Sequence, residues 1–185
     1  MQFPFNKRKA AQAAAYLLAR HSGRLSYLLL IKMLYFADRQ SLIETGQQIT
    51  GDQMVSMPHG PVLSEIYDLI NWWKADEQPT WFEYISEKDG YDVCLTKKNP
   101  ERDELSEYEV ETLGKIDQIY GHLSRWRVRD ISHSLPEWKD PQGSSRPIDP
   151  ADILRFAGKP EDEIERVAAD AEELWLFKTL QQGKV

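Results

Sequence analysis

The stretch that decides the fold is residues 31–67, which read IKMLYFADRQSLIETGQQITGDQMVSMPHGPVLSEIY. Its first part belongs to a predicted helix, Leu25–Glu44, that is apolar on nearly every side between Tyr27 and Ala37, with Lys32 as the exception. A helix that is apolar all round is a buried one. We therefore predict a buried central helix over about residues 25–44, with Gly46 as its terminator.

The second part of the stretch predicts a strand and then another helix. Gln53–Met57 favours a short strand, and a turn follows at Pro58. Helices accept proline at their first position, so Pro61 with Gly60 before it as a cap predicts a helix start. The segment Pro61–Lys74 has one apolar and one polar face at helical spacing, as an amphipathic helix does.

Helical patterns also occupy much of the rest of the chain. Ser106 and Glu109 form a capping box that opens a helix ending at Gly121. The other predicted helices are Arg8–His21, Ser124 to about Ser134, a short one after Asp149-Pro150, and Glu161–Lys178 with an apolar stripe. The predicted strands are fewer and shorter. Trp81–Ser86 and Tyr91–Thr96, separated by a segment ending in Asp89-Gly90, indicate a hairpin.

These patterns predict a mainly α (α+β) fold. It is a helical domain around the buried central helix, with a small antiparallel β-sheet or hairpin. The breaker-rich segment Asp140–Pro150 reads as a linker or surface loop. We expect residues 1–138 to form one domain, with residues 139–185 as a C-terminal extension whose amphipathic helix packs on the same domain.

Composition narrows the class of protein. The 185 residues carry a formal net charge of −7 and a single cysteine, Cys94. One cysteine cannot form an internal disulfide, and an acidic chain is repelled by phosphate backbones. The longest apolar run, Tyr27–Ile31, is far shorter than the ~20 residues of a membrane helix. The amino terminus has no apolar core of a secretory signal. We expect a cytoplasmic protein without a membrane partner, and nucleic acid is not an expected partner.

Catalytic and metal-binding signatures are absent from the sequence. It contains no His-x-x-x-His, no Cys-x-x-Cys and no acidic calcium loop, and no glycine-rich nucleotide loop. We therefore predict a protein that is not an enzyme and uses no metal or cofactor. A small hydrolase using His59 or His133 with Asp38 is an alternative. A DNA-binding regulator using Arg125 and Arg129, which share a helix face, is another.

Four polar residues each allow a structural and a functional interpretation. Asp38 and Arg39 lie among apolar helical neighbours, so at least one charge must approach the core and needs a partner there. Asp38 either anchors the fold, for instance by accepting backbone N–H groups from the Gly46–Gly51 loop, or contacts a partner at a binding groove. His59 is a packing or an interface residue at the predicted helix start, and His133 is more easily a structural residue.

Four segments, taken together and in order, resemble a known family. They are Lys32–Arg39 (KMLYFADR), Ile49–Tyr67 (ITGDQMVSMPHGPVLSEIY), the Leu105–Gly121 helix and Ser132–Trp138 (SHSLPEW). The set resembles the Panacea domain of the SocA-like antitoxins, over about Arg8–Trp138. The motif residues that carry over are Tyr35, Phe36, Asp38, Gly51, Asp52, Gly60, Pro61, Tyr67, His133 and Trp138; Arg39 and His59 lie beside them.

The resemblance implies a prophage-associated antitoxin of a toxin–antitoxin system. Such a protein binds and neutralises a cognate protein toxin, encoded by the neighbouring gene, through protein–protein interaction. The family has no established catalytic residues, and its members pair with unrelated toxins. An alternative role is that of a proteolytic adaptor, which delivers the toxin to a cytoplasmic protease. The C-terminal helix, outside the recognised pattern, is a candidate for toxin contact.

Overall fold

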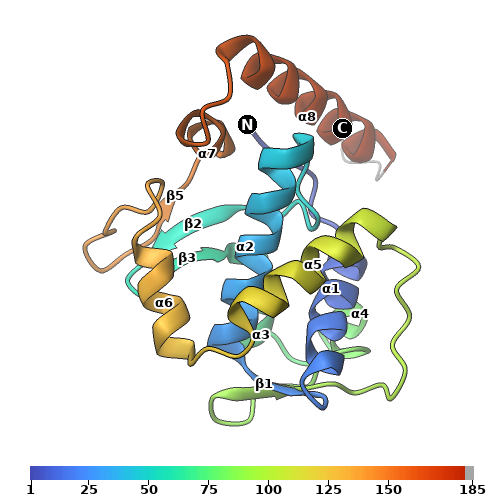
Figure 1. Ribbon diagram of the computed structural model, residues 1–185. Helices are drawn as coiled ribbons and strands as arrows, with labels where there is room; N and C mark the ends of the chain where they lie inside the picture. The colour runs from blue at the N-terminus through green and yellow to red at the C-terminus, as the bar shows by residue number, and fades with distance from the viewer. Residues whose placement is uncertain (182–185) are drawn as a thin grey trace.

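The computed structural model describes residues 1–181, which form a helical body with two small antiparallel sheets (Figure 1). The elements in chain order are α1 (Lys7–Arg20), β1 (Arg24–Ser26), α2 (Tyr27–Thr45), β2 (Met54–Met57), β3 (Gly60–Leu63), α3 (Ser64–Asn71), α4 (Pro79–Phe82), β4 (Asp92–Cys94), α5 (Glu107–Tyr120), α6 (Arg125–His133), β5 (Arg146–Pro147), α7 (Pro150–Phe156) and α8 (Glu161–Gln181). The predicted mainly α fold with a small antiparallel sheet is confirmed.

Helix α2 is the buried centre of the molecule, as its composition predicts. It runs through the middle of the body and packs against α1, α5, α6, α7 and β3 (Figure 1). Its buried residues form an unbroken run from Leu29 to Asp38, and the helix ends at Gly46, which adopts φ 75°. A helix in this position must bury its polar side chains together with its apolar ones.

The strands form two antiparallel sheets. In the larger one β2 lies in the middle, between β3 and β5, and in the smaller one β1 pairs with β4. The predicted strand over Gln53–Met57 is therefore β2. Strand β5 forms one edge of this sheet and lies inside Asp140–Pro150, the segment predicted to be a linker or surface loop.

The predicted helix start at Pro61 is wrong. Gly60–Leu63 is strand β3, in which Pro61 pairs with Ser56, and helix α3 begins only at Ser64. An edge strand tolerates a proline because one side of its backbone has no ladder partner. The cap of α3 comes from a distant place: the Asp52 carboxylate accepts the backbone N–H groups of Glu65 and Ile66, at 2.9 Å each.

The predicted hairpin over residues 81–96 is confirmed only in part. Trp81 lies in the short helix α4, but the chain turns back at the Asp89–Asp92 bridge and Ile85 pairs with Leu95, with the N–H of Ser86 donating to the Cys94 carbonyl at 2.8 Å. Strand β4 pairs on its other side with β1, where Leu25 lies opposite Val93. Both of these side chains are buried, so the sheet forms where it covers the core.

The remaining predicted helices are present close to their expected bounds. Helix α5 has the complete capping box, in which the Ser106 hydroxyl accepts from the N–H of Glu109 and the Glu109 carboxylate accepts from the N–H of Ser106. Helix α6 is capped by Ser124, and α7 by Asp149 with Pro150 at its first position.

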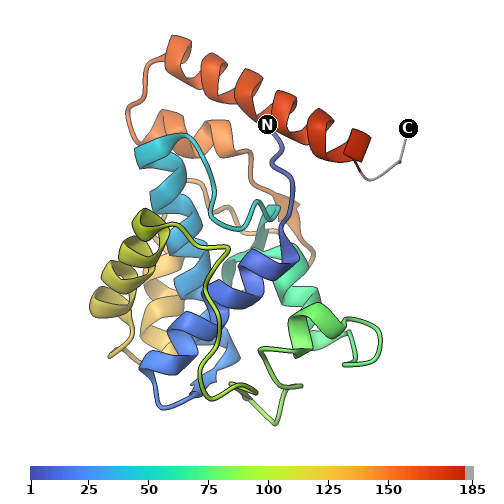
Figure 2. The ribbon, with the colours of Figure 1, turned by 90° about the vertical axis from the view of Figure 1, so that its right-hand side faces the viewer.

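Helix α8 lies across the end of the molecule where α2 terminates (Figure 2). Its Ile164 and Ala171 are buried, and Val167 lies against Gly46, where an added Cβ would be 2.7 Å from the valine Cγ2. Residues 139–181 thus contact the helical body through β5, α7 and α8. A domain boundary at residue 138 stays a prediction.

The amino-terminal segment passes over the loop between α2 and β2. The N–H of Asn6 donates to the carbonyl of Thr50 at 2.9 Å. Gly51 adopts φ 71°, and a Cβ placed there would lie 2.3 Å from the carbonyl oxygen of Pro4. Gly51 therefore meets two requirements at once, a left-handed backbone and a close backbone approach.

Gly51→Ala should destabilise the protein more than Gly90→Ala does. Gly90 also has positive φ, 62°, but a Cβ there meets nothing within 4 Å. Gly90→Ala should cost about 1 kcal/mol, from left-handed strain alone. Gly51→Ala should cost at least about 1 kcal/mol more, since the amino-terminal segment must move away. Urea unfolding of both variants measures the difference, and equal costs would show that the Pro4 contact is easily relaxed.

Candidate interaction site

The motif residues gather in three places around α2. The first holds Asp38, Gly51 and Asp52; the second holds Tyr35 and Arg39; the third holds Gly60, Pro61, His133 and Trp138. Each place joins α2 or β2 to a segment far away in the sequence. Phe36, another motif residue, stacks on Tyr120 of α5 with ring centroids 4.4 Å apart.

At the first of these three places, two buried aspartates, Asp38 and Asp52, are connected by hydrogen bonds through Thr50. Asp38 accepts the N–H of Thr50 at 3.0 Å and its hydroxyl at 2.5 Å. The Thr50 hydroxyl oxygen accepts the N–H of Asp52, at 3.1 Å, and Asp52 caps α3. Asp38 thus accepts a backbone N–H from the Gly46–Gly51 loop, in agreement with the structural interpretation.

Burial governs the protonation of both aspartates. Desolvation raises the pKa of Asp38 to about 7, against the two hydrogen bonds from Thr50, which favour the charged form. Desolvation likewise raises the pKa of Asp52 to about 7, against the N–H groups of Glu65 and Ile66. A carboxyl with a pKa near neutrality can serve as an acid or base, but both groups are buried and occupied by the backbone that they hold.

The second place is a buried ion pair that involves a residue outside the site prediction. The Arg39 guanidinium donates to the Glu137 carboxylate at 2.6 and 3.4 Å, and the Tyr35 hydroxyl donates to it at 3.1 Å. The side chain of Glu137 has no exposed surface. Burial raises the pKa of Tyr35 well above its ordinary value, with the Glu137 charge as the next cause. This contact fixes the segment after α6 to α2.

The third place surrounds the Lys32 ammonium group. Lys32 is fully buried, and its Nζ donates to the Pro61 carbonyl at 2.6 Å. Gly60 adopts φ 90°, and a Cβ there would lie 2.3 Å from Ser132 Oγ and 2.8 Å from Lys32 Nζ. Desolvation, with a smaller contribution from the Arg129 charge, lowers the pKa of Lys32 to about 7.

His133 and Trp138 extend the third place to the sheet. Their rings stack with centroids 4.3 Å apart, and the Trp138 indole donates to the Met57 carbonyl at 3.1 Å. Burial, followed by the charges of Lys32 and Arg129, lowers the pKa of His133. Among the described residues neither His133 nor His59 forms a hydrogen bond with Asp38, whose carboxylate is bonded to Thr50, so the hydrolase alternative has no assembled dyad there.

Two predicted site residues lie apart from these places. His59 is exposed in the turn between β2 and β3 rather than at a helix start. Tyr67 is half-buried on α3 and packs against the core. The motif therefore holds the fold together at most of its positions. Whether any of its residues also touches a toxin stays a prediction.

A large exposed apolar surface lies on α8, outside the motif. Leu176, Phe177 and Leu180 are 49%, 58% and 64% exposed. They lie off the predicted stripe, of which Ile164 and Ala171 are buried. Sequence reasoning missed this second face, although the run WLFKTL over residues 175–180 is the signal for it. Single exposed apolar residues are ordinary, but a contiguous group marks an interaction surface.

A second surface combines arginine with aromatic rings. The Arg125 guanidinium lies 4.4 Å from the Tyr91 ring centroid and 5.0 Å from that of Trp126, and Arg129 lies 5.1 Å from Trp126. These are cation–π distances. Tyr91 and Trp126 are exposed, so the arginines of the regulator alternative stack on the protein's own rings.

Among residues 1–181, no group of three His, Cys, Asp or Glu side chains could hold a metal ion. None of the helices in that range is long and apolar enough to cross a membrane.

Comparison with known proteins gives the family. Residues 30–139 match the model described as "Antitoxin SocA-like, Panacea domain", which is more than half of the 185 residues. The chain belongs to this family, as the resemblance predicts. The match begins inside α2, later than the expected Arg8, and leaves α7 and α8 outside. No curated protein and no solved structure matches the chain.

Lys32→Met should change how stability depends on pH. Between about pH 7, the pKa in the folded state, and 10.5, the ordinary value, only the unfolded chain keeps the proton on Lys32. The free energy of unfolding should therefore rise with pH in the wild type by up to about 1.4 kcal/mol per pH unit more than in the variant. Urea unfolding across this window measures the slopes. Lys98→Met, which alters an exposed lysine, is the control and should keep the wild-type slope. Equal slopes for all three proteins would contradict the prediction that the buried Lys32 amine is neutral in this window.

Arg39→Met should destabilise the protein by about 3–5 kcal/mol, because it leaves the buried Glu137 carboxylate without its charge partner. Adding Glu137→Met should recover most of that loss, since the double variant buries no charge at this place. Urea unfolding of the two single variants and the double variant measures the coupling. If Arg39→Met lowers the free energy of unfolding by less than about 1 kcal/mol, the ion pair contributes no more than an exposed surface salt bridge does.

Proposed function

We propose that this protein is an antitoxin that neutralises a cognate protein toxin by direct binding, and that the second half of α8 carries the contact. The observation that carries the proposal is the exposed apolar face of Leu176, Phe177 and Leu180 on a member of an antitoxin family. We place the pair in the cytoplasm and expect the toxin gene to lie beside this one, in a prophage-associated operon.

The internal contacts of the motif support this location. Lys32, Asp38 and Arg39 are each engaged with another segment of the same chain. A buried charge that is already paired offers little to a partner, since exposing it would break the fold. The contact surface is therefore sought outside the motif, where large apolar side chains remain uncovered.

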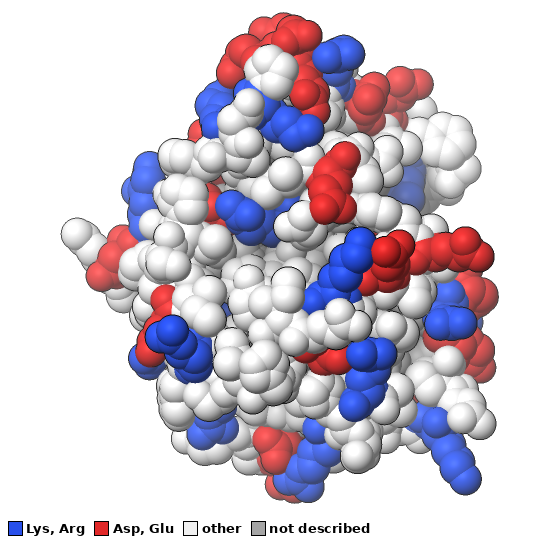
Figure 3. Space-filling model, viewed as in Figure 1, with Lys and Arg blue, Asp and Glu red and all other residues white. Residues whose placement is uncertain are grey.

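The charge of α8 indicates the chemistry of the partner. Residues 161–181 contain seven acidic and two basic side chains, and acidic side chains cover the start of α8 in the surface view (Figure 3). An amphipathic helix binds by laying its apolar face into a groove. The complementary toxin surface is an apolar groove with a basic rim, and a stable complex would bury about 1,600 Å² in total.

The adaptor alternative is favoured by a different observation. A protein that delivers a toxin to a protease needs two partner surfaces. The exposed ladder of Tyr91, Arg125 and Trp126 lies on α6 and the β4 side of the molecule, away from α8 (Figure 1). Tyrosine, tryptophan and arginine are the residues enriched at binding hot spots, so this ladder is the candidate second surface.

Phe177→Ala and Leu180→Ala should each weaken toxin binding by at least about tenfold, because central apolar anchors contribute most of the binding energy. The toxin is sought by co-expression with each neighbouring gene, scored by growth, and the complex is measured by copurification and calorimetry. Ile119→Ala, which truncates a 54% exposed isoleucine on α5, is the matched control and should keep full rescue.

The outcomes separate the candidate roles. Full rescue and an intact complex with the Phe177→Ala/Leu180→Ala double variant would rule out the α8 contact. The adaptor role would be established instead by three results together. Rescue of growth requires a cellular protease, the toxin protein disappears from the cells, and Trp126→Ala abolishes the rescue. Absence of toxicity in both neighbouring genes would remove the main support for the antitoxin proposal.

A further inference from the structure

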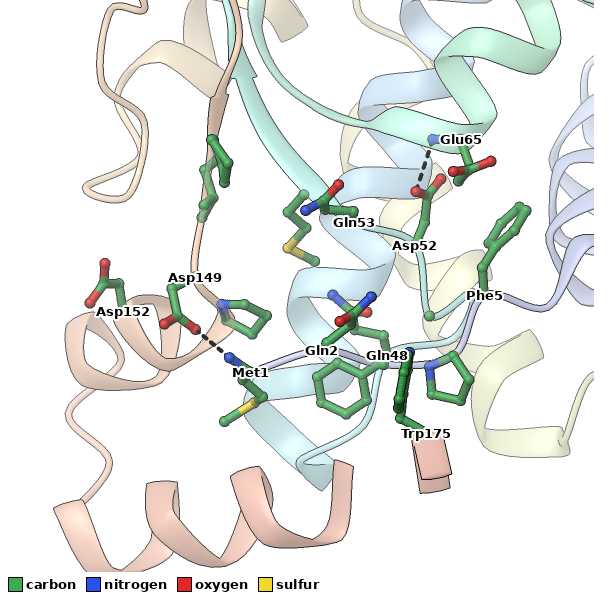
Figure 4. A pocket seen from close by; sticks show the side chains of 17 residues that line it. Met1, Gln2, Phe5, Gln48, Asp52, Gln53, Glu65, Asp149, Asp152 and Trp175 are labelled. Atoms are coloured by element: carbon green, nitrogen blue, oxygen red, sulfur yellow. Dashed lines mark hydrogen bonds and ion pairs between the residues drawn. The ribbon is translucent and has the colours of Figure 1, made fainter. Parts of the chain in front are cut away.

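A pocket of about 520 Å³ lies between the amino-terminal segment, the loop before β2, the β5–α7 connection and α8 (Figure 4). Its size falls within the range of small-ligand sites, about 300–1,000 Å³. Five segments that are far apart in the sequence form its wall, since Glu65 of α3 lines it as well and α8 contributes Trp175. The pocket shares Gly51 and Asp52 with the first cluster of motif contacts and no residue with the other two.

The side chain of Gln48 is the unusual feature of the pocket. The residue is 9% exposed, yet neither its Nε2 nor its Oε1 is hydrogen-bonded to a described residue. Leaving a buried donor or acceptor without a partner costs about 1–3 kcal/mol. The amide lies in the middle of the lining, between the side that carries Asp149 and the side that carries Asp52 (Figure 4). The side-chain amide has an N–H donor and an oxygen acceptor side by side, so it can pair with the C=O and the N–H of a peptide group.

The charged side chains around the pocket are all acidic. Asp52, Glu65, Asp149 and Asp152 line it, and no lysine, arginine or histidine does so among the described residues. Asp52 caps α3 and Asp152 pairs with Arg155 at 3.0 Å. Glu65 is exposed and forms no ion pair with a described residue. The amino-terminal ammonium group of Met1 also lies in the lining and pairs with Asp149 at 3.4 Å. The carboxylates outnumber this one positive group, so the field in the pocket favours a cation.

Trp175 supplies an aromatic surface for that cation. It is 37% exposed and lies at the same end of the pocket as Gln48 in the close-up view (Figure 4). A guanidinium group stacks on an indole ring and donates to carboxylates at the same time. An ammonium group has no planar face to stack, so this combination fits arginine better than lysine.

We propose that this pocket binds an arginine side chain together with its own peptide group. The Gln48 amide pairs with the peptide group, Trp175 stacks on the guanidinium, and the acidic lining of the pocket, Glu65 included, attracts its charge. The source of the arginine is an extended segment of the toxin, inserted beside the apolar face of α8. This last assignment rests on the proposed function, whereas the site itself rests on the geometry of the pocket.

The direct test is a titration of the full chain, isotope-labelled for NMR, with N-acetyl-arginine methylamide. The side-chain amide signals of Gln48 and the indole N–H signal of Trp175 should shift along one saturation curve. N-acetyl-citrulline methylamide, which has the same shape without the charge, should bind at least about tenfold more weakly. Equal binding of the two probes, or saturation without shifts of these two signals, would overturn the proposal.

Variants test the same assignment from the protein side. Gln48→Leu removes the unpaired amide with little change in volume, so it should not lower the melting temperature, and it should weaken the arginine probe by at least about tenfold. Glu65→Gln should weaken the probe as well. Gln118→Leu, at an exposed position on α5, is the control and should bind as the wild type does. Unchanged binding in Gln48→Leu would overturn the site.

The origin of the arginine is tested separately. Tighter binding of the blocked probe than of free arginine supports a peptide ligand, and the reverse order identifies a free amino acid. If the toxin supplies the arginine, Gln48→Leu should also weaken the toxin complex. Probe binding lost in Gln48→Leu with an unchanged toxin complex would overturn the toxin as the source. The α8 contact is tested independently by Phe177→Ala, which alters a residue outside the pocket lining.

Discussion

The structure depends on how one buried helix satisfies its polar side chains. Helix α2 is surrounded by other elements, so the polar ends of Lys32, Asp38 and Arg39 must find partners inside the protein. Each finds a different segment: the β3 carbonyl of Pro61, the Thr50 loop, and Glu137 after α6. A buried polar group left without its partner costs about 1–3 kcal/mol, and a charged group costs more. These three contacts therefore fix where the sheet, the loop and the end of α6 lie.

The helical part of the fold could be predicted because its signals are local. The apolar run of α2, the capping box of α5 and the Asp-Pro start of α7 each lie within a few residues of the element they define. The start of α3 could not be predicted in this way. The residue that caps it, Asp52, lies 13 and 14 residues before the N–H groups of Glu65 and Ile66 that it accepts, so the local Gly60-Pro61 pattern was more conspicuous than the true signal. Pro61 belongs to edge strand β3, and its carbonyl accepts a hydrogen bond from Lys32.

The candidate site could be predicted only in part, for a related reason. The resemblance identified the motif residues, and the cost of burying charge indicated that Asp38 and Arg39 needed partners. Nothing in the sequence indicates that the partner of Arg39 is Glu137, because Glu137 lies 98 residues further along the chain. The unpaired amide of Gln48 was equally invisible, because a glutamine in a polar loop carries no sequence signal. Only the folded chain places it against Trp175 of α8 in one pocket.

The proposed contact on α8 has a physical consequence for partner recognition. The resemblance implies that members of this family pair with unrelated toxins, and a fold held together by its own motif is compatible with such variety. Substitutions at exposed positions such as Phe177 and Leu180 change little of the free energy of folding, whereas those at Lys32 or Glu137 disturb several elements at once. If α8 carries the contact, its outer face can change with the toxin while α2 stays the same. The specificity of such a protein then resides in the part of the chain that the family pattern does not cover.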